Sequence, residues 1–335
     1  MKAIEVQGAW GVENLAIVDQ DKPQAGPGEV LLHIKAAALN YRDLMTVKGM
    51  GGVTELPLIP FSDGMAEVEA VGEGVTRVKV GDKVCPLFFP TWLDGEPKIE
   101  EVSVALGGTH PGVLREYMVL SEEGVTPIPS HLSDVEAATL PCAGLTAWRA
   151  VAEIGKVGPG DIVLVQGTGG VSIFGLQFAK ALGAEVIVTS SSDEKLARAK
   201  EMGADYLINY KTDENWSAKV MELTGGRGAD LIVEVGGGET LGQSIGAAAF
   251  AGTIVIIGVL SGYAQNIVVP VVFGKNLTLS GISVGSRAMF ERMTACIEEN
   301  NITPVVDKIY PFSEVKEALT AMENGSHFGK ICLEN

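Results

Sequence analysis

Up to about residue 120, the chain carries short apolar runs that are separated by Gly, Pro and Asp. Each run has the length and composition of a β-strand, and triplets such as Gly26-Pro27-Gly28 provide turns between the runs. This pattern predicts a barrel-like, mainly β unit. We expect strands at residues 2–6, 29–37, 65–71, 83–87 and 114–120.

The pattern changes after Ser133, which together with Glu136 forms the capping-box signature of a helix start. From Asp161 onward, continuous apolar runs alternate with helical segments. Strands that are apolar on both faces are typical of a parallel sheet covered by helices. The alternation therefore predicts a doubly wound α/β sheet, the Rossmann architecture. The expected strands are residues 162–166, 185–189, 206–208, 231–235 and 253–257, with helices between them that include 193–202, 216–223 and 241–249.

From about Pro304, the chain returns to strand-like segments at 305–310 and 330–333 around one helix. We expect this segment to complete the first unit. The predicted fold class is therefore α/β, with a mainly β substrate domain at 1–125, completed by 300–335, and a Rossmann domain at 126–299. The length of 335 residues also favours two domains over one.

Charge and composition exclude several classes of partner. The formal net charge of −17 would repel a nucleic-acid backbone, so we expect no nucleic-acid partner. No apolar run is long enough to span a bilayer, and the N-terminus lacks a secretory pattern, so we expect a cytoplasmic protein without a membrane partner. The cysteines are isolated from one another, which indicates neither a disulfide framework nor a structural zinc site. They are Cys85, Cys142, Cys296 and Cys332.

The segment Gly167-Thr168-Gly169-Gly170-Val171-Ser172 follows a predicted strand and opens a predicted helix. A pyrophosphate needs backbone N–H groups aimed at it and a close approach to the chain, and glycine together with a helix N-terminus provides both. In this context the motif predicts a dinucleotide site, with an ordinary tight turn as the alternative. Ser172 stands where a third glycine is usual.

The second strand of the predicted sheet bears on the choice between NAD and NADP. An NAD site places an acid at the tip of this strand, whereas this chain has Ser190-Ser191-Ser192 there, followed by Lys195. Small hydroxyls leave room for a 2′-phosphate, and the lysine supplies a cation for it. We therefore expect NADP. Two alternatives remain: Ser191 and Glu194 could form a capping box, and Asp193 could bind a ribose hydroxyl.

The glycine turn, residues 140–148 and Asn40-Tyr41-Arg42-Asp43 together resemble the medium-chain dehydrogenase/reductase superfamily. Within it, the chain is most similar to the zinc-independent quinone oxidoreductase and NADP-dependent alcohol dehydrogenase-like branch. The resemblance implies a GroES-like substrate domain and a Rossmann domain. It also implies homodimers or higher homo-oligomers, often formed through the edge of the cofactor domain.

The resemblance is informative at the metal positions. Zinc members carry a cysteine where this chain has Asn40, and a His–Glu pair where it has Ser62-Asp63. Only Cys142 keeps a sulfur. Because zinc needs three or four protein ligands, we expect no zinc, with a residual site of Asp63 and Cys142 as the alternative.

The resemblance also assigns cofactor contacts. Thr146 is expected near the nicotinamide, and Lys195 with Tyr210 is expected to hold the 2′-phosphate. Further contacts are implied at Gly258-Val259-Leu260 for the nicotinamide riboside, Ser283-Val284-Gly285 for the carboxamide, and Lys330 for the pyrophosphate. Core packing or an ordinary turn is the alternative for each.

Without zinc, other groups must stabilise the charge on the substrate oxygen. By analogy with the family, Asn40, Tyr41 and Ser62 converge on the former metal position and are the candidate catalytic residues; alternatively, they only line the pocket. The preferred function is hydride transfer between NADPH and a small carbonyl or alcohol. A quinone or enone reductase is the alternative enzyme, and a non-catalytic NADPH-binding structural protein is the alternative from a different class.

Overall fold

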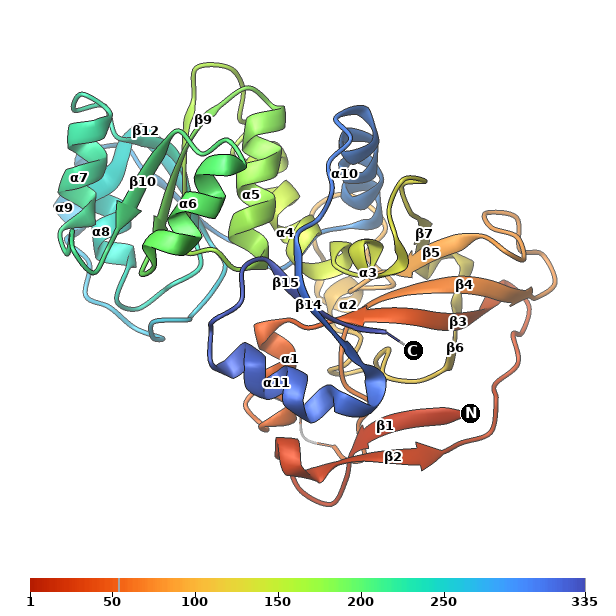
Figure 1. Ribbon diagram of the computed structural model, residues 1–335. Helices are drawn as coiled ribbons and strands as arrows, with labels where there is room; N and C mark the ends of the chain where they lie inside the picture. The colour runs from red at the N-terminus through yellow and green to blue at the C-terminus, as the bar shows by residue number, and fades with distance from the viewer. Residues whose placement is uncertain (54, 335) are drawn as a thin grey trace. The chain divides into compact units, whose positions relative to one another are not determined.

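A computed structural model describes residues 1–53 and 55–334 (Figure 1). The chain divides into two compact units. The first, here called the β-rich unit, comprises Met1–Leu145 and Val284–Asn335. The second, here called the Rossmann unit, comprises Thr146–Ser283. Within the described part of the chain, no helix is long and apolar enough to cross a membrane.

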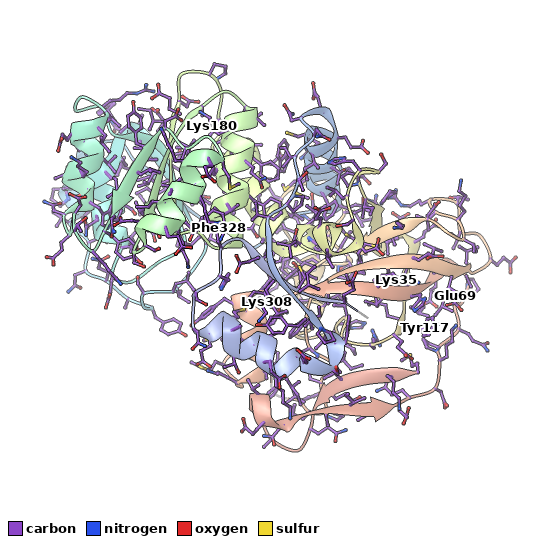
Figure 2. The ribbon with its side chains drawn as sticks, viewed as in Figure 1. Lys35, Glu69, Tyr117, Lys180, Lys308 and Phe328 are labelled. Atoms are coloured by element: carbon purple, nitrogen blue, oxygen red, sulfur yellow. The ribbon has the colours of Figure 1, made fainter. Side chains whose placement is uncertain are left out.

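The β-rich unit is built on a seven-stranded sheet of order β14-β15-β3-β4-β5-β7, in which β6 also pairs with β3. A separate two-stranded sheet pairs β1 with β2. The bounds are β1 Lys2–Val6, β2 Leu15–Asp19, β3 Glu29–Ala38, β4 Asp63–Val71, β5 Lys83–Pro86, β6 Tyr117–Ser121, β7 Val125–Pro127, β14 Val306–Pro311 and β15 Lys330–Glu334. Figure 2 shows Lys35, Glu69 and Tyr117 gathered on the same part of this unit, where Tyr117 also stacks on His33.

The end of the chain completes this sheet, as expected. β15 lies beside β3 (Figure 1) and pairs antiparallel with it, with Cys332 opposite Ala38 in the register. The helices of the unit are α1 Tyr41–Val47, α2 Ile99–Val102, α3 Asp134–Ala137, α10 Arg287–Glu299 and α11 Val315–Glu323.

The unit boundaries differ from the expected 125/126 and 299/300. Residues 126–145 and 284–299 belong to the β-rich unit. The reason is long-range pairing: Thr126 on β7 lies opposite Cys85 on β5, α3 packs against β3 and β4, and α10 packs against β7. Helical periodicity alone does not reveal which sheet a helix covers.

The Rossmann unit contains a six-stranded, wholly parallel sheet of order β10-β9-β8-β11-β12-β13. This confirms the predicted doubly wound fold, and the strand order reverses between β8 and β11, where such sheets bind ligands. The strands are β8 Ile162–Gln166, β9 Glu185–Ser190, β10 Tyr206–Asn209, β11 Ala229–Glu234, β12 Ala248–Ile256 and β13 Thr278–Gly281; the helices are α4 Leu145–Trp148, which begins at the unit boundary, α5 Gly170–Ala181, α6 Asp193–Glu201, α7 Trp216–Leu223, α8 Leu241–Ala247 and α9 Val269–Gly274.

One predicted helix ends earlier than expected. α8 stops at Ala247, and Ala248 turns into an extended conformation that starts β12. The ammonium of Lys275 donates to the carbonyls of Ile245, Gly246 and Ala248, and thereby satisfies acceptors that a helix end leaves open. The sequence pattern did not predict this cap, because Lys275 lies far from the end of α8 in the sequence.

Candidate active site

The glycine turn connects β8 to α5 as predicted. Gly167 adopts φ +70°, a left-handed conformation, and Gly169 is the N-cap of α5. A Cβ at Gly167 or Gly169 would meet nothing within 4 Å, so packing inside the protein does not require glycine at either position. The open space over the turn and the start of a twelve-residue helix fit a phosphate group that approaches the backbone.

The structure explains Ser172. Its buried hydroxyl donates to the main-chain carbonyl of Gln166 over 2.5 Å. A glycine at this position would allow close packing of helix and strand, whereas the serine ties the first turn of α5 to the last residue of β8.

A buried carboxylate that the sequence interpretation missed lies beside this turn. Glu234 ends β11, is 0% exposed and belongs to the strand next to β8. Five donors within the described residues bond its side chain: Gln166 Nε2, Thr240 Oγ1, Ser244 Oγ, Gly236 N and Gly237 N. The carboxylate therefore holds the loops after β8 and β11 together. The available signal was an acid that directly follows the apolar strand residues 231–233.

The residues expected at the 2′-phosphate lie at one corner of the sheet. Ser190 on β9 is in register with Asn209 on β10, and Tyr210 N donates to Ser190 O over 3.0 Å. Lys195 lies in the first turn of α6, whose N-cap is Ser192. The proposed capping role of Ser191 was therefore wrong by one residue, since the hydroxyl of Ser192 accepts from Lys195 N.

Asp193, which was the alternative ribose ligand, accepts a 2.6 Å hydrogen bond from Asn209 Nδ2. Its carboxylate is thus already engaged at the corner where Ser190 and Tyr210 meet. Ser190 is buried, and Tyr210 is 42% exposed.

The other expected cofactor contacts differ in environment. Thr146 is buried, whereas Val259 and Leu260 are exposed. Gly258 must be glycine, because a Cβ there would come within 2.2 Å of Val235 O. Val284 is buried with φ +47°, a strained conformation for a β-branched residue and one that concentrates at functional sites.

Asn40 lies in the β-rich unit as the N-cap of α1. Its backbone N–H donates to Asp43 Oδ2 over 2.8 Å, so Asp43 stabilises the start of this helix. Burial raises the pKa of the Asp43 carboxyl, and Arg42 opposes that shift from 3.3 Å away. Tyr41 is 42% exposed on the first turn of the helix, unlike the buried Asn40 and Ser62.

Asp63 occupies the centre of the former metal position. Its two oxygens accept from Ser62 Oγ at 2.7 Å and from Cys142 N at 3.1 Å. Burial raises the pKa of its carboxyl to about 6, while the charge of Lys330 pulls the pKa down. The hydroxyl proton of Ser62 is therefore committed to Asp63.

This donor set does not fit zinc. Asn40 and Ser62 supply an amide and a hydroxyl, whereas zinc sites are built from thiolates, imidazoles and carboxylates. The ammonium of Lys330 bonds Asn40, so a cation of the protein itself already lies at the site. Among residues 1–53 and 55–334, no three His, Cys, Asp or Glu side chains are grouped to hold a metal ion.

Comparison with known proteins identifies relatives over the whole chain. Residues 26–130 match the alcohol dehydrogenase GroES-like domain, and residues 170–299 match the zinc-binding dehydrogenase domain. A zinc-type alcohol dehydrogenase-like protein of Schizosaccharomyces pombe is 45% identical over 332 residues, covering 97% of this chain and 96% of the relative.

Solved structures agree in fold. One from Sinorhizobium meliloti 1021, assigned as an alcohol dehydrogenase, has a TM-score of 0.93 at 45% identity and covers 100% of this chain and 99% of its own. An NAD-dependent alcohol dehydrogenase has a TM-score of 0.91 at 36% identity, with both chains fully covered. A crotonyl-CoA carboxylase/reductase in complex with NADP has a TM-score of 0.88 at 26% identity, covering 100% and 94%. The chain therefore belongs to the medium-chain dehydrogenase/reductase superfamily and is an alcohol dehydrogenase-like oxidoreductase.

Proposed function

We propose that this enzyme transfers hydride between NADPH and a small carbonyl or alcohol without a zinc ion. The observation that carries the proposal is the pairing of a buried asparagine with a buried lysine at the position where zinc members bind their metal. An amide donor can stabilise negative charge on a substrate oxygen in place of a Lewis acid. The unsuitable set of zinc ligands supports the same reading.

NADPH, when bound, supplies the hydride. The residues that would hold it are the glycine turn at Gly167–Val171 for the pyrophosphate, and Ser190, Ser191, Lys195 and Tyr210 for the 2′-phosphate. The engagement of Asp193 by Asn209 supports NADP over NAD, because an NAD site needs a free acid to accept from the ribose. Asn40 would donate a hydrogen bond to the substrate oxygen, and water would supply the proton that converts the alkoxide to the alcohol. Tyr41 is the first residue of the helix that Asn40 caps.

The central test compares NADPH with NADH as reductants of a simple aldehyde, a 2-enone and a quinone, with metal analysis of the same sample. We expect kcat/KM for NADPH to exceed that for NADH at least about tenfold. Equal values would refute the cofactor proposal, and stoichiometric zinc would refute the zinc-free one. Turnover of the enone or quinone alone would establish a conjugate reductase, and tight NADPH binding with no turnover would establish a binding protein.

A matched pair of variants sharpens the cofactor test. Lys195→Ala should weaken NADPH binding by about 10- to 100-fold and leave NADH binding unchanged, since only NADPH carries the 2′-phosphate. Lys200→Ala removes the same charge at the other end of α6, where its ammonium donates to Asp205 O, and should change neither affinity. A parallel loss of both affinities in Lys195→Ala would contradict the assignment.

We also propose that the protein forms a homodimer through β13. This strand is the edge of the sheet and pairs only with β12 within the described chain. Exposed apolar side chains precede it, a combination that favours association with a second copy. They include Tyr263, Val268, Val269 and Phe273, which are 57–73% exposed.

The oligomeric state tests this assembly directly. Phe273→Glu should convert the dimer to a monomer in light scattering, because it places a charge in an apolar interface. Ile99→Glu, at a side chain that is 84% exposed in the β-rich unit, serves as the control and should leave the mass unchanged. A wild-type monomer at micromolar concentration would overturn the proposal.

A further inference from the structure

Lys330 is a buried cation inside the β-rich unit. It is 3% exposed and is the first residue of β15. Its ammonium donates to Leu39 O and, over 2.6 Å, to Asn40 Oδ1. These partners differ from the pyrophosphate that the sequence suggested.

The backbone before Lys330 is fixed. Phe328, which Figure 2 labels, is 2% exposed. Gly329 adopts φ +83°, and a Cβ there would come within 2.4 Å of Val305 O. Lys330 N donates to the same carbonyl over 2.9 Å. Hydrogen bonds therefore fix both the backbone N–H and the ammonium group of Lys330.

The contact with Lys330 decides which way the Asn40 amide points. An ammonium has only donors, so the amide atom that faces it must be the oxygen. Nδ2 is then forced to the opposite side. It is buried and has no hydrogen-bond partner among the described residues. Nδ2 lies near enough to Asp63 to help lower the pKa of that carboxyl, but without hydrogen-bond geometry.

The charged side chains around Asn40 favour a neutral ligand. Lys330 and Arg42 supply two positive charges, and Asp43 and Asp63 supply two negative charges when ionised. A carboxylate ligand would add an uncompensated charge to this buried set. A ketone or aldehyde oxygen would accept from Nδ2 without changing the balance. The ammonium behind the amide also polarises it and strengthens the remaining donor.

We propose that Lys330 is a positioning residue, which locks the Asn40 amide so that Nδ2 donates to the oxygen of a neutral carbonyl substrate. The proposal rests on the proposed function and specifies its substrate class. In this proposal Lys330 acts on the substrate oxygen indirectly, by orienting Asn40, and it does not bind the cofactor.

The decisive comparison uses Asn40→Asp. Aspartate is as good an N-cap as asparagine and keeps an acceptor for Lys330, but it presents no donor to the substrate. We expect kcat to fall about 10²- to 10³-fold in samples that circular dichroism shows to be folded, although the added buried carboxylate should lower the melting temperature. A kcat within threefold of wild type would overturn the role of Nδ2.

Lys330 itself is tested by Lys330→Met and Lys330→Arg. Lys330→Met frees the amide to rotate, so kcat should fall about 100-fold while the Kd for NADPH stays within twofold. Arginine also has donors only, so Lys330→Arg should recover a substantial part of the lost rate. In the double variant with Asn40→Ala, the two losses should not add. Additive losses, or a Kd for NADPH raised tenfold at unchanged kcat, would overturn the proposal.

Two further measurements are needed. The first shows whether a lost rate comes from misfolding, and the second distinguishes failure of the proposed function from failure of this inference. Lys275→Met removes a partly buried ammonium from the other unit and should lower the melting temperature without the kcat loss. Isobutyramide, a neutral carbonyl analogue that is not reduced, should bind wild type with NADPH at least tenfold more tightly than it binds Asn40→Asp. If no carbonyl is turned over but this difference holds, the proposed function fails and the positioning role stands. Equal isobutyramide binding overturns the positioning role.

Discussion

The hydroxyl of Ser172 donates a 2.5 Å hydrogen bond to the carbonyl of Gln166, the last residue of β8. The amide of Gln166 in turn donates to Glu234 over 2.7 Å and accepts from Val235 N and Gly236 N. The glycine turn is thus tied on one side to its own helix and on the other to the neighbouring strand. A cofactor would meet a backbone that is already ordered, which reduces the entropy lost on binding.

Ser172→Ala should lower the free energy of unfolding by about 1 kcal/mol, because it removes one buried hydrogen bond. Ser172→Gly restores the residue usual in this motif, yet it should cost about 1 kcal/mol more than alanine, since glycine is a poor helix former. Urea denaturation of the three proteins measures the order. A glycine variant as stable as wild type would contradict this account of the serine.

Glu234→Gln should lower the free energy of unfolding by at least about 2 kcal/mol, because an amide N–H₂ replaces one acceptor oxygen among five donors. Affinity for NADPH should also weaken, since the loop at Gly236 and Gly237 loses an anchor. Glu239→Gln makes the same chemical change at an exposed position in the following turn and is the control. Calorimetric binding and chemical denaturation of both variants check the prediction.

Asp63→Asn should reveal a pH-dependent cost of the buried carboxyl. Its pKa is about 6 in the folded protein and 3.8 in the reference state, so the folded state keeps a proton that the unfolded chain releases. The contribution of this carboxyl to the free energy of unfolding is fully present below pH 3.8 and is lost as the pH rises through about 6. The loss is at most about 3 kcal/mol.

The asparagine variant lacks this titration. The free energy of unfolding of the variant, relative to that of wild type, should therefore be higher at pH 7.5 than at pH 4.5. Urea unfolding at both pH values measures this difference. Comparison of the two proteins cancels the titration of groups elsewhere in the chain. A difference that does not change with pH would show that Asp63 titrates normally.

Lys275→Met should cost about 2 kcal/mol, because three carbonyls around the end of α8 lose a charged donor. Methionine keeps most of the side-chain length and its packing. Lys219→Met breaks a surface ion pair with Glu222 and should cost less than about 0.5 kcal/mol. Thermal unfolding distinguishes the two, and equal melting temperatures would refute the capping role.

Much of the fold and part of the candidate site could be read from the sequence, because local patterns set them. Continuous apolar strands alternating with amphipathic helices are sufficient for a doubly wound sheet, and the glycine turn needs only its neighbours in the chain to be placed. The absence of the zinc ligands at Asn40 and Ser62 is also a local fact. The division into units was less accurate, since residues 126–145 and 284–299 pack on a sheet remote from them in sequence.

Tertiary structure alone decided how polar groups are paired. Gln166 and Glu234 lie 68 residues apart, and Asn40 and Lys330 lie 290 residues apart. No periodicity brings such residues together; burial does, because a polar group removed from water must find a partner wherever the chain supplies one. The sequence alone predicted a dinucleotide site at the glycine turn and showed altered residues at the family's metal positions. The folded chain decided which groups Ser172, Glu234 and Lys330 bond.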